Sequence, residues 1–416
     1  MVMDIMEDIT FRKNLNSLET VLDKNEILSL IINAKDTTYL THNFHPFPGK
    51  FIPQIPKFFI NKFSEKGQYI LDPFCGCGTT LVEAKLLHRN AIGIDIHPLG
   101  VFISEVKTTK IPEDELNEIP KILRIIEGRI NKFVRKNQGN KTLFDFIDKS
   151  NIIKDFSYTL PDFPNRDHWF QQHILHELSI IKTSITQANI SQKLKDFLLL
   201  AFSYIIIPVS NQESETRYAA INKNILPGKS YLYFKEKVLD MVTRMKMFNK
   251  LASDSEVKIY CADTRKIDFI EENSVDLIIT SPPYPNTYDY YLYHKLRMFW
   301  LDLDWKKAKL NEIGSRLRHS SQRENINTYI KDMTACFSHF ARILKLDKPF
   351  VIVVGDSIIR KEFFRGDIII KEIAEKTGFK VVDKVSYSLN YASKSFNPAF
   401  RSKVKQEHII LLKNNK

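Results

Sequence analysis

The chain has 416 residues, of which 43% are hydrophobic and 26% are charged, and these values exclude a globally disordered protein. Lysine and arginine number 61 against 49 aspartate and glutamate residues, so the formal net charge is +12. A basic surplus of this size suits a polyanionic partner but is equally compatible with a solvated basic surface. Gly and Pro are scarce, at 13 and 17 residues, which argues against long flexible linkers.

The cysteines and the apolar runs bear on where the protein resides. The four cysteines, Cys75, Cys77, Cys261 and Cys336, show neither zinc spacing nor a disulfide framework, so we expect a reducing, cytoplasmic location and no metal site. The N-terminal sequence lacks the order of a signal peptide. The most apolar run, 197–209, is about 13 residues long, whereas a membrane span needs roughly 20. We therefore expect a buried helix there and no membrane partner.

The first part of the chain predicts the start of a parallel sheet. Residues 1–40 have a polar, helical pattern, and a proline-punctuated loop at 41–53 leads into an apolar-periodic helix. A strand at Tyr69–Leu71, a Gly-rich turn, a helix at about Thr79–Leu87 and a strand at Ala91–Ile94 follow. This order is a βαβ unit, which is typical of sheets with helices on both faces.

The pattern then changes to helical spacing and later returns to strands. Residues 111–250 carry apolar residues at helical intervals with few strand signals. The predicted elements that follow are strands at 257–263 and 274–284, a helix at 326–344, a strand at 349–357, a helix that ends at Gly378, a strand after it, and a final strand at 406–414. We predict an α/β, Rossmann-like fold with an N-terminal helical segment (1–40), a catalytic domain in two parts (41–110 and 251–416) and a mostly helical insertion (111–250).

A glycine-rich turn joins the first predicted strand to its helix, with the sequence DPFCGCGTT from Asp72 to Thr80. Glycines permit tight turning and close approach of a ligand to the backbone. The following helix start offers free N–H groups to a carboxylate or another polar group. Asp95 ends the next strand, where an acid can accept hydrogen bonds from ribose hydroxyls; the alternative is a cap for the helix after His97.

Ser281-Pro282-Pro283-Tyr284 follows directly on the apolar strand VDLIIT. Two prolines make a stiff, extended loop, which presents the Ser281 hydroxyl and the Pro282 carbonyl at the carboxyl edge of the sheet. Both oxygens can accept hydrogen bonds from the amino group of a flat base, and Tyr284 offers a ring on which that base can stack. The alternative is a proline-rich turn without a function.

Together these segments resemble the amino-methylating DNA methyltransferases, the cytosine-N4 and adenine-N6 family. DPFCGCGTT resembles the family's FxGxG cofactor motif, and TSPPY resembles its catalytic (D/N/S)PP(Y/F) motif. HPFPGKFIP at 45–53 resembles the segment that closes over the methionine end of the cofactor, and CADTR at 261–265 resembles the acidic motif that contacts its adenine. The resemblance implies a methyltransferase sheet that uses S-adenosyl-L-methionine.

The resemblance also implies the roles of particular residues. The expected cofactor-binding residues are His45, Phe47, Lys50, Asp72, Pro73, Phe74, Cys75, Gly76, Gly78, Thr79, Asp95, Ile96 and Asp263. The expected catalytic residues are Ser281, Pro282, Pro283 and Tyr284, which hold a base that has been flipped out of the duplex. No Pro-Cys dipeptide occurs, so the sequence does not offer the nucleophile that cytosine C5 methylation requires.

The expected activity is transfer of a methyl group to cytosine N4, because Ser at the first position of the tetrapeptide favours cytosine N4 within the family. The order of the motifs, with the cofactor motif first, is more usual in adenine-N6 enzymes, so adenine N6 is the alternative. A guanine-N2 RNA methyltransferase is a second alternative, and a binding subunit without activity is a third. We expect double-stranded DNA as partner, and a cognate restriction endonuclease encoded separately.

The insertion is the expected target-recognition element because of its position in the chain. Helices there could bring basic side chains to phosphates and other side chains to base edges; the alternative is a helical buttress. The expected DNA contacts are Arg217, Lys223 and Lys229 around a Pro-Gly turn, together with Tyr288 and Tyr290 as stacking rings.

Overall fold

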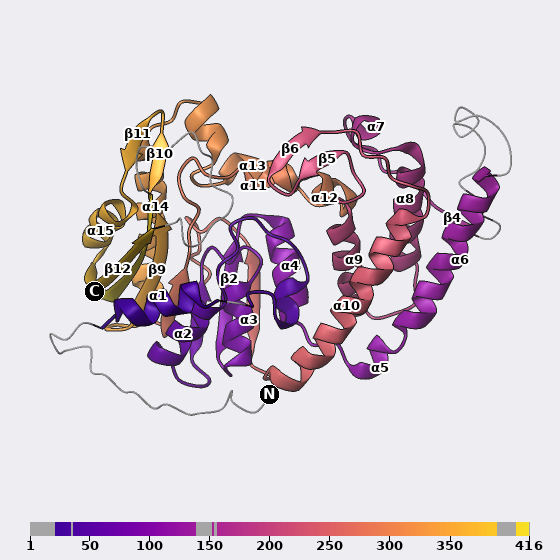
Figure 1. Cartoon of the computed structure of the whole chain (residues 1–416). Helices are drawn as coiled ribbons and strands as arrows, with labels where there is room; N and C mark the ends of the chain where they lie inside the picture. Colours follow the sequence, from indigo (N-terminus) through magenta and orange to yellow (C-terminus); the bar gives the residue numbers. More distant parts are fainter. Residues whose placement is uncertain (1–20, 35, 139–151, 154–155, 389–404, 416) are drawn as a thin grey trace.

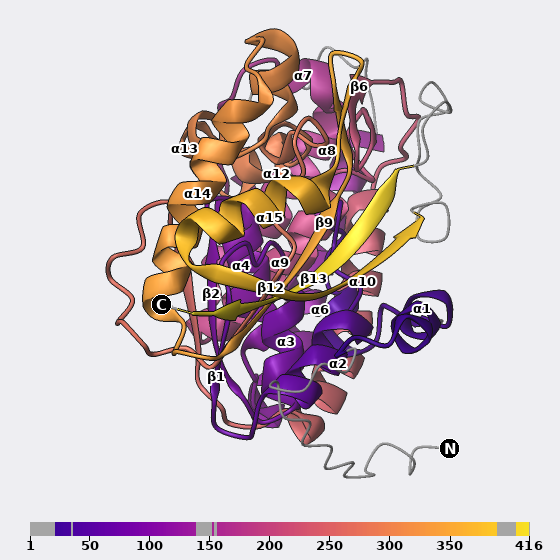
Figure 2. The same ribbon diagram turned by 90° about the vertical axis from the view of Figure 1, so that its left-hand side faces the viewer.

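The structure is a computed structural model that describes residues 21–34, 36–138, 152–153, 156–388 and 405–415. Seven strands of this described part form one sheet in the order β12-β13-β9-β8-β1-β2-β7 (Figures 1 and 2). Their bounds are β1 Tyr69–Asp72, β2 Asn90–Asp95, β7 Val257–Cys261, β8 Leu277–Thr280, β9 Pro349–Gly355, β12 Phe379–Ser388 and β13 Gln406–Asn414. Strand β13 runs antiparallel to both of its neighbours, and the other pairings are parallel. The predicted Rossmann-like α/β class is confirmed.

The order of the strands creates a switch point between β1 and β8. From β1 the chain moves outward through β2 to β7, and it then returns to β8 on the other side of β1 and continues to β9. At such a point the loops that leave the two central strands diverge, which opens a crevice beyond their carboxyl ends. The DPFCGCGTT turn leaves β1 and the SPPY tetrapeptide leaves β8, so both motifs flank this crevice.

Helices cover both faces of the sheet, as the unbroken apolar runs of its strands require. On β9, Phe350 and Ile352 pack toward α14 (Ile326–Ile343) and α15 (Gly366–Thr377). Their neighbours Val351 and Val353 point to the other face, where α1 (Lys24–Ile32), α2 (Gln54–Phe63) and α3 (Thr79–Leu86) pack. Both sets of strand residues are almost completely buried. Successive residues of a strand face opposite sides, so one strand serves two cores.

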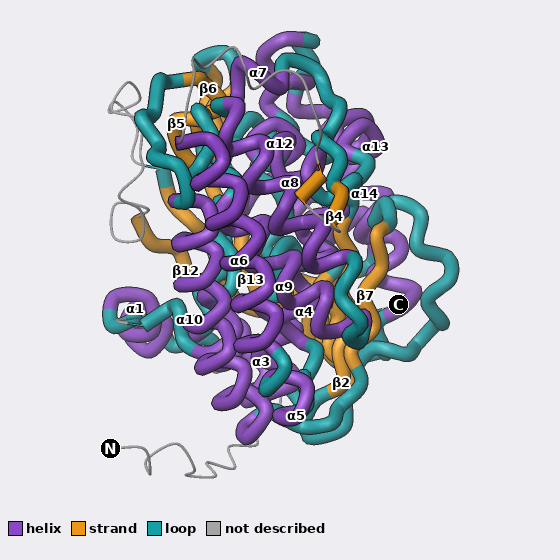
Figure 3. The backbone as a smooth tube through the Cα atoms, turned by 90° about the vertical axis from the view of Figure 1, so that its right-hand side faces the viewer, coloured by secondary structure: helices purple, strands orange, loops and turns teal. Residues whose placement is uncertain are grey.

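A mainly helical lobe lies beside the sheet and contains a third core (Figures 1 and 3). Its helices are α4 (Pro98–Thr108), α5 (Glu113–Leu116), α6 (Ile119–Gln138), α7 (Arg166–Trp169), α8 (Gln172–Thr186), α9 (Gln192–Ile205) and α10 (Lys229–Leu251). Phe197 and Phe202, from the most apolar run, are fully buried in α9, which confirms a buried helix there. None of the helices in the described ranges combines the length and apolar character needed to cross a membrane.

Several short elements were not predicted. They are the hairpins β3–β4 (Ile152–Ile153 and Phe156–Ser157), β5–β6 (Gln212–Ser214 and Arg217–Ala220) and β10–β11 (Ser357–Ile359 and Glu362–Phe364), the helices α11 (Tyr290–Tyr293), α12 (Lys295–Trp300) and α13 (Trp305–Asn311), a 3-10 turn at Leu40–Asn43 and a π-helical turn at Leu317–Ser321. Of the predicted helical segment 1–40, residues 1–20 and 35 lie outside the described chain, and α1 covers part of the remainder. The division of the chain into the segment 1–40, the two-part catalytic domain and the insertion stays a prediction.

A buried arginine fastens hairpin β5–β6 to α12. The Arg297 guanidinium, which is fully buried, donates to both carboxylate oxygens of Glu215 at 2.6 and 2.7 Å and to the Ser203 carbonyl of α9 at 3.0 Å. Gln212 Nε2 of the same hairpin donates to the Tyr293 carbonyl at 3.3 Å. The hairpin of the helical lobe is therefore held against the segment that follows the SPPY tetrapeptide.

We predict that Arg297→Ala lowers the free energy of unfolding by roughly 3 kcal/mol, the lower end of the range for breaking a buried ion pair, because Glu215 keeps 32% of its side chain exposed. Denaturant unfolding monitored by circular dichroism measures the change. Arg217→Ala is the matched control, because its side chain is 69% exposed and surface substitutions usually cost less than about 0.5 kcal/mol. Equal losses in the two variants would contradict the structural role of Arg297.

Candidate active site

A pocket lies at the switch point, with about 850 Å³ of empty space that is partly open to solvent. This volume is within the range of roughly 300–1,000 Å³ that is usual for small-molecule sites. Six parts of the chain supply its lining, which consists of Phe47, Gly49, Lys50, Phe51, Asp72, Phe74, Cys75, Gly76, Cys77, Thr79, Asp95, Ile96, His97, Asp263, Thr264, Ser281, Pro283, Tyr290, Asn311, Glu312 and Ile313. Most of the predicted cofactor residues and two residues of the tetrapeptide thus border one space.

The glycine turn is held tightly by α4. Gly76 and Gly78 have φ values of 51° and 76°, in the left-handed region that favours glycine. A Cβ on Gly78 would lie 2.7 Å from Ser104 Oγ, so a larger residue does not fit there. Ser104 Oγ donates to the Gly76 carbonyl at 3.0 Å, and the buried Lys107 Nζ donates to the Cys77 carbonyl at 2.6 Å. Because α4 side chains bind these carbonyls, the turn keeps a fixed shape around the pocket.

Two buried carboxylates organise the floor of the pocket. Asp95 accepts hydrogen bonds from the Gly76 amide at 2.7 Å and the His97 amide at 2.8 Å, which aims its carboxylate toward the turn. Asp72 accepts from Thr280 Oγ1 at 2.7 Å and from the Phe74 amide at 3.2 Å. Burial raises the pKa of both groups to about 6, against the opposing effect of these hydrogen bonds. His97, and not Asp95, caps α4.

The loop at 41–53 forms one wall of the pocket. The Phe47 ring stacks on Tyr290, with a centroid distance of 5.5 Å and an interplanar angle of 16°. Lys50 lines the pocket, but its amino group donates to the Thr37 carbonyl at 3.1 Å and the His42 carbonyl at 3.3 Å. His45 is a correction to the predicted set, because its buried ring turns away: Nδ1 donates to the Pro46 carbonyl at 2.8 Å and Nε2 lies 3.1 Å from Ser203 Oγ.

Pro73 and Gly78 also do not line the pocket and instead support its shape. The Pro73 carbonyl accepts a hydrogen bond from Thr264 Oγ1 at 2.7 Å, which ties the glycine turn to the segment after β7. Gly78 is the N-cap residue of α3. These two predicted residues therefore contribute through the backbone, while Thr264 itself borders the cavity.

The tetrapeptide divides between the pocket and the sheet. Ser281 and Pro283 line the pocket, whereas Pro282 and Tyr284 are not part of its lining. Tyr284 Oη donates to Glu407 Oε1 at 2.7 Å and lies 3.2 Å from Ser281 Oγ. Its ring leans over Gly355, where an added Cβ would approach it to 2.7 Å. Burial and the Glu407 charge raise the pKa of Tyr284 well above its usual range, so this phenol stays neutral.

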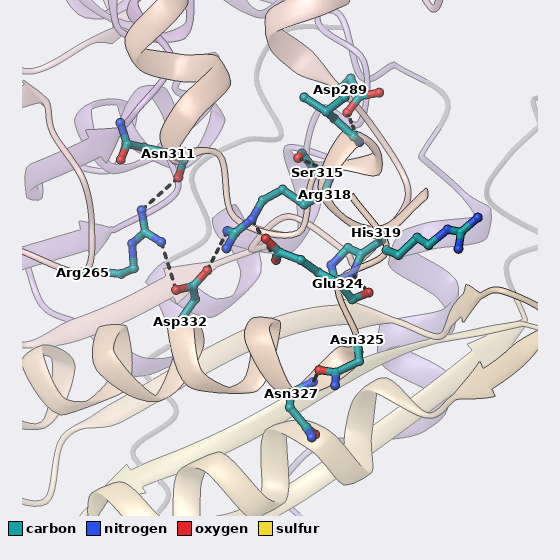
Figure 4. Close-up of polar contacts among 12 residues, drawn as sticks. Arg265, Asp289, Asn311, Ser315, Arg318, His319, Glu324, Asn325, Asn327 and Asp332 are labelled. Carbon is teal, nitrogen blue, oxygen red and sulfur yellow. Dashed lines mark hydrogen bonds and ion pairs between the residues drawn. The ribbon is translucent and has the colours of Figure 1, made fainter. Parts of the chain in front are cut away.

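The acid after β7 is tied into an ion-pair network. Asp263 receives two hydrogen bonds from the Arg265 guanidinium, at 2.9 and 2.7 Å, and these outweigh burial and lower its pKa. Arg265 also donates to Asp332 at 2.9 Å and to the Asn311 carbonyl at 3.1 Å. Arg318 binds the other oxygen of Asp332 at 2.9 Å, so the two guanidinium groups flank one carboxylate (Figure 4).

Eight lining residues were not predicted: Gly49, Phe51, Cys77, His97, Thr264, Asn311, Glu312 and Ile313. Most of these residues lie next to a recognised motif in the chain, and that closeness in sequence could have identified them. Residues Asn311 to Ile313 follow α13 and carry no motif, so nothing in the sequence pointed to them. Glu312 is nevertheless the most unusual of the set, because burial raises the pKa of its carboxyl well above the usual range.

The predicted DNA contacts have different surroundings. Arg217 is 69% exposed on β6 and pairs with Glu213 at 2.8 Å. Lys223 is half-buried, and its amino group donates to the Ile207 carbonyl at 3.0 Å, so its predicted contact with DNA stays a prediction. The Lys229 amino group lies 4.8 Å from the centre of the Tyr233 ring. Tyr290 lies in the pocket wall, and Tyr288 lies beside it with a ring separation of 5.4 Å.

A second polar cluster lies away from the pocket. Ligating atoms of Asp356, Asp367 and His408 fall within 4.8 Å of one another and are buried. Asp367 pairs with Arg365 at 2.7 Å and with Lys384, while Asp356 accepts from His408 Nε2 at 2.9 Å. These basic groups balance the carboxylates, so the cluster is a closed polar network that holds β9, β13 and α15 together.

The charges in the pocket favour a cationic ligand. Among the described lining residues, Asp72 and Asp95 are charged above their pKa of about 6, Arg265 balances the charge of Asp263, and Lys50 is the basic side chain of the lining. Burial lowers the pKa of His97 to about 4, so that ring is neutral. A ligand that combines hydroxyl groups, a flat ring and positive charge matches a buried carboxylate at a strand end, an aromatic wall and this acidic surplus.

Comparisons with known proteins agree with these features. A family model described as DNA methylase matches residues 13–106 and 275–416, and one described as an RMKL-like methyltransferase domain matches 64–149. The Type II methyltransferase M.MjaII of Methanocaldococcus jannaschii is 25% identical over 446 residues, covering 89% of this chain and 81% of that protein. The Type II methyltransferase M.MvaI of Kocuria varians is 28% identical over 322 residues, covering 73% and 66%.

Among solved structures, a SAM-dependent methyltransferase of Methanosarcina mazei aligns with 89% of this chain and 99% of its own, at 8% identity and a TM-score of 0.33. This likeness is too low to carry an argument about function. The assignment of this site as a methyltransferase site therefore depends on the strand order of the sheet, the pocket at its switch point and the match to the family model.

Titration of the two floor carboxylates leads to a pH-dependent binding prediction for S-adenosyl-L-methionine, a cation. Asp72 and Asp95 are charged above their pKa of about 6 and neutral below it. The affinity for S-adenosyl-L-methionine should therefore reach its highest value above pH 7 and fall as the pH drops through 6. We expect the Kd at pH 5 to be about tenfold higher than at pH 7.5 if one of these groups dominates. Isothermal calorimetry between pH 5 and pH 7.5 measures the Kd for S-adenosyl-L-methionine. A Kd that stays constant over this range in the folded protein would contradict the prediction.

Proposed function

Because the chain belongs to the DNA methylase family, whose members methylate exocyclic amino groups with S-adenosyl-L-methionine, we propose that it methylates N4 of a cytosine in double-stranded DNA. The family model covers more than half of the chain. The observation that carries the proposal is that Ser281 and the glycine turn border the same pocket. The nucleophilic amino group and the methyl donor can therefore meet at one place.

The cofactor-binding role of this pocket is supported by its chemistry. Asp95 is aimed at the turn and can accept hydrogen bonds from the ribose hydroxyls, while Phe74 and Ile96 offer apolar surface. Asp72 and the carbonyls around the turn suit the positively charged methionine end, with Phe47 as a wall. Asp263, which also lines the pocket, is the acid that we assign to the adenine amino group. When bound, S-adenosyl-L-methionine supplies a methyl group carried on a positively charged sulfur.

Catalysis then rests on positioning by the tetrapeptide. The lone pair of a cytosine amino group is delocalised into the ring, which makes that nitrogen a poor nucleophile. Ser281 Oγ and the Pro282 carbonyl can accept its two hydrogens and so favour a localised lone pair. The Ser281 hydroxyl lies 3.2 Å from Tyr284 Oη, which in turn donates to Glu407, so its orientation is held from behind. Well-oriented reactants can gain roughly 7–11 kcal/mol from positioning alone.

Flipping of the base is part of the proposal, because an amino group that is paired inside a duplex cannot enter a pocket lined by Ser281. Tyr288 and Tyr290 are the rings that could stack on the base, and Tyr290 closes the wall beside Phe47, whereas Glu407 holds Tyr284 away from the pocket. The proposal assigns to the helical lobe the recognition of the target sequence. Exposed Arg217 on hairpin β5–β6, which Arg297 and Gln212 hold beside α11 and α12, supports this assignment.

A role in a restriction-modification system follows from the kind of relatives that the chain has. The two curated relatives named above are Type II methyltransferases. In such a system, methylation of the host's sites would protect them against a cognate endonuclease encoded separately.

The test of the proposed activity is transfer of a labelled methyl group to mixed-sequence duplex DNA, followed by digestion to nucleosides and mass spectrometry. We expect N4-methylcytosine, because position 281 is serine. N6-methyladenine would refute the choice of base and leave the mechanism in place. Label in transfer RNA and none in DNA would instead indicate the guanine-N2 RNA activity.

Ser281→Ala tests the tetrapeptide directly. Removing one acceptor that acts on the reacting amino group should lower kcat about 10²-fold, as loss of a single polar contact in a preorganised site commonly does. The Kd for S-adenosyl-L-methionine should stay unchanged, because Asp95 and the glycine turn do not depend on Ser281. Single-turnover kinetics with calorimetry separate the two quantities. A normal kcat would contradict the assignment of Ser281.

A further inference from the structure

The proposed function leaves one proton without an acceptor. When the amino nitrogen bonds to the methyl carbon, it keeps both of its hydrogens and becomes positively charged, so one proton must leave. Ser281 Oγ and the Pro282 carbonyl accept hydrogen bonds but cannot hold that proton, because their protonated forms are very strong acids. Members of the family with aspartate at the first position of the tetrapeptide carry a carboxylate there, and this chain does not.

Four carboxyl groups line the pocket, and three of them are engaged elsewhere. Asp95 and Asp72 accept hydrogen bonds that hold the glycine turn and the end of β8. Asp263 binds Arg265 through both of its oxygens. An oxygen already committed to a guanidinium or to backbone amides is a weak proton acceptor, since protonation would break those bonds.

Glu312 differs from the other three. Its Oε1 accepts the Tyr290 amide at 2.9 Å, whereas Oε2 is buried and has no hydrogen-bond partner among the described residues. The side chain as a whole is 5% exposed and borders the pocket. A buried polar atom without a partner is costly to leave in that state, and such atoms often mark a place where a substrate completes the contacts.

The segment that contains Glu312 packs against residues 285–289, which follow the tetrapeptide. The Asn286 amide donates to the Gly314 carbonyl at 2.9 Å, and the Leu317 amide donates to Asp289 at 2.9 Å. A Cβ on Gly314 would lie 3.4 Å from Pro285 Cα, so the two segments are in close contact. Glu312 and Ser281 border the same pocket, so the carboxyl group shares the space in which the proposed target amino group would bind.

The ion-pair network holds this segment in place (Figure 4). Arg265 donates to the Asn311 carbonyl, one residue before Glu312, and Arg318 anchors the far end of the segment to Asp332 at 2.9 Å and to Glu324 at 3.0 Å. Both guanidinium groups share Asp332. A catalytic group gains from such support, because its geometry is set before the substrate arrives.

We propose that Glu312 is the base of this reaction, and that its Oε2 takes the proton that leaves the target amino nitrogen. The N–C bond forms from the nitrogen lone pair, and the S–C bond breaks with its electron pair left on sulfur. The N–H bond then breaks, its electron pair returns to nitrogen, and the proton forms an O–H bond at Oε2. Water takes up that proton when the products leave. The proposal rests on the proposed function.

The surroundings of Glu312 favour this task. Burial raises its pKa most, and the charges of Asp289 and Asp95 raise it further, whereas the amides of Tyr290 and Tyr291 lower it. A base must be deprotonated before it acts, so the rate of methyl transfer should rise as the pH increases through the raised pKa of Glu312.

The experiment compares wild-type protein with Glu312→Gln. Glutamine keeps the carbonyl oxygen that accepts the Tyr290 amide but cannot take a proton. We expect the single-turnover rate of methyl transfer to DNA to fall about 10²-fold, the lower end for general acid–base catalysis, and the rise of the rate with pH to disappear. The Kd for S-adenosyl-L-methionine should change less than about threefold. Glu372→Gln, on exposed α15, is the matched control and should behave as wild type.

Two further measurements keep the proposal open to refutation. In ¹³C NMR of protein labelled at glutamate carboxyls, the signal that Glu312→Gln lacks should titrate above the ordinary glutamate range; titration in that range would overturn the proposal. Glu312→Asp, which retains a carboxylate, should keep the pH dependence at a reduced rate. An unchanged rate in Glu312→Gln, or a loss explained by cofactor affinity alone, would also overturn it. Wild-type protein that transfers no methyl group to DNA would refute the proposed function itself.

Discussion

The hydrogen bond from Thr280 Oγ1 to Asp72 Oδ1, at 2.7 Å, joins the ends of the two central strands. These residues end β8 and β1, which lie side by side at the switch point of the sheet although 208 positions separate them in the chain. The bond sets the distance between the glycine turn that follows Asp72 and the tetrapeptide that follows Thr280. Both strands are buried on their two faces, so neither can shift without disturbing two cores.

Other parts of the molecule support this junction from outside. Ser104 and Lys107 of α4 bind the carbonyls of the glycine turn, and Glu407 on β13 holds the Tyr284 hydroxyl behind the tetrapeptide. On the open side, the pairing of Arg265 and Arg318 with Asp332 holds the segment after α13. A site built in this way is preorganised, since residues outside its lining hold the glycine turn, the tetrapeptide and the segment after α13.

Much of the sheet and of the pocket could be predicted from the sequence. Strands β1, β2, β8 and β9 were recognisable because their apolar residues end at or just before Gly, Pro or Asp, and the glycine turn and the tetrapeptide marked two parts of the pocket. The short hairpins and α11 to α13 were missed, since elements of a few residues have little periodicity and depend on tertiary contacts such as that of Arg297 with Glu215. Glu312 was missed for a related reason: its burial arises from the folded segment and not from neighbouring residues. His45 was included in the predicted site because it lies within a recognised motif, but its ring contacts Ser203 of the helical lobe and does not line the pocket.

The central claim is that one pocket at the switch point holds both the methyl donor and the target base. A crystal structure of the protein with S-adenosylhomocysteine and a duplex that contains its site tests this most directly. The account predicts that the ribose hydroxyls contact Asp95, that the sulfur faces Ser281, and that a cytosine stands outside the duplex with its amino group between Ser281 and Glu312. A cofactor bound away from the glycine turn, or a target base that remains stacked in a productive complex, would contradict it.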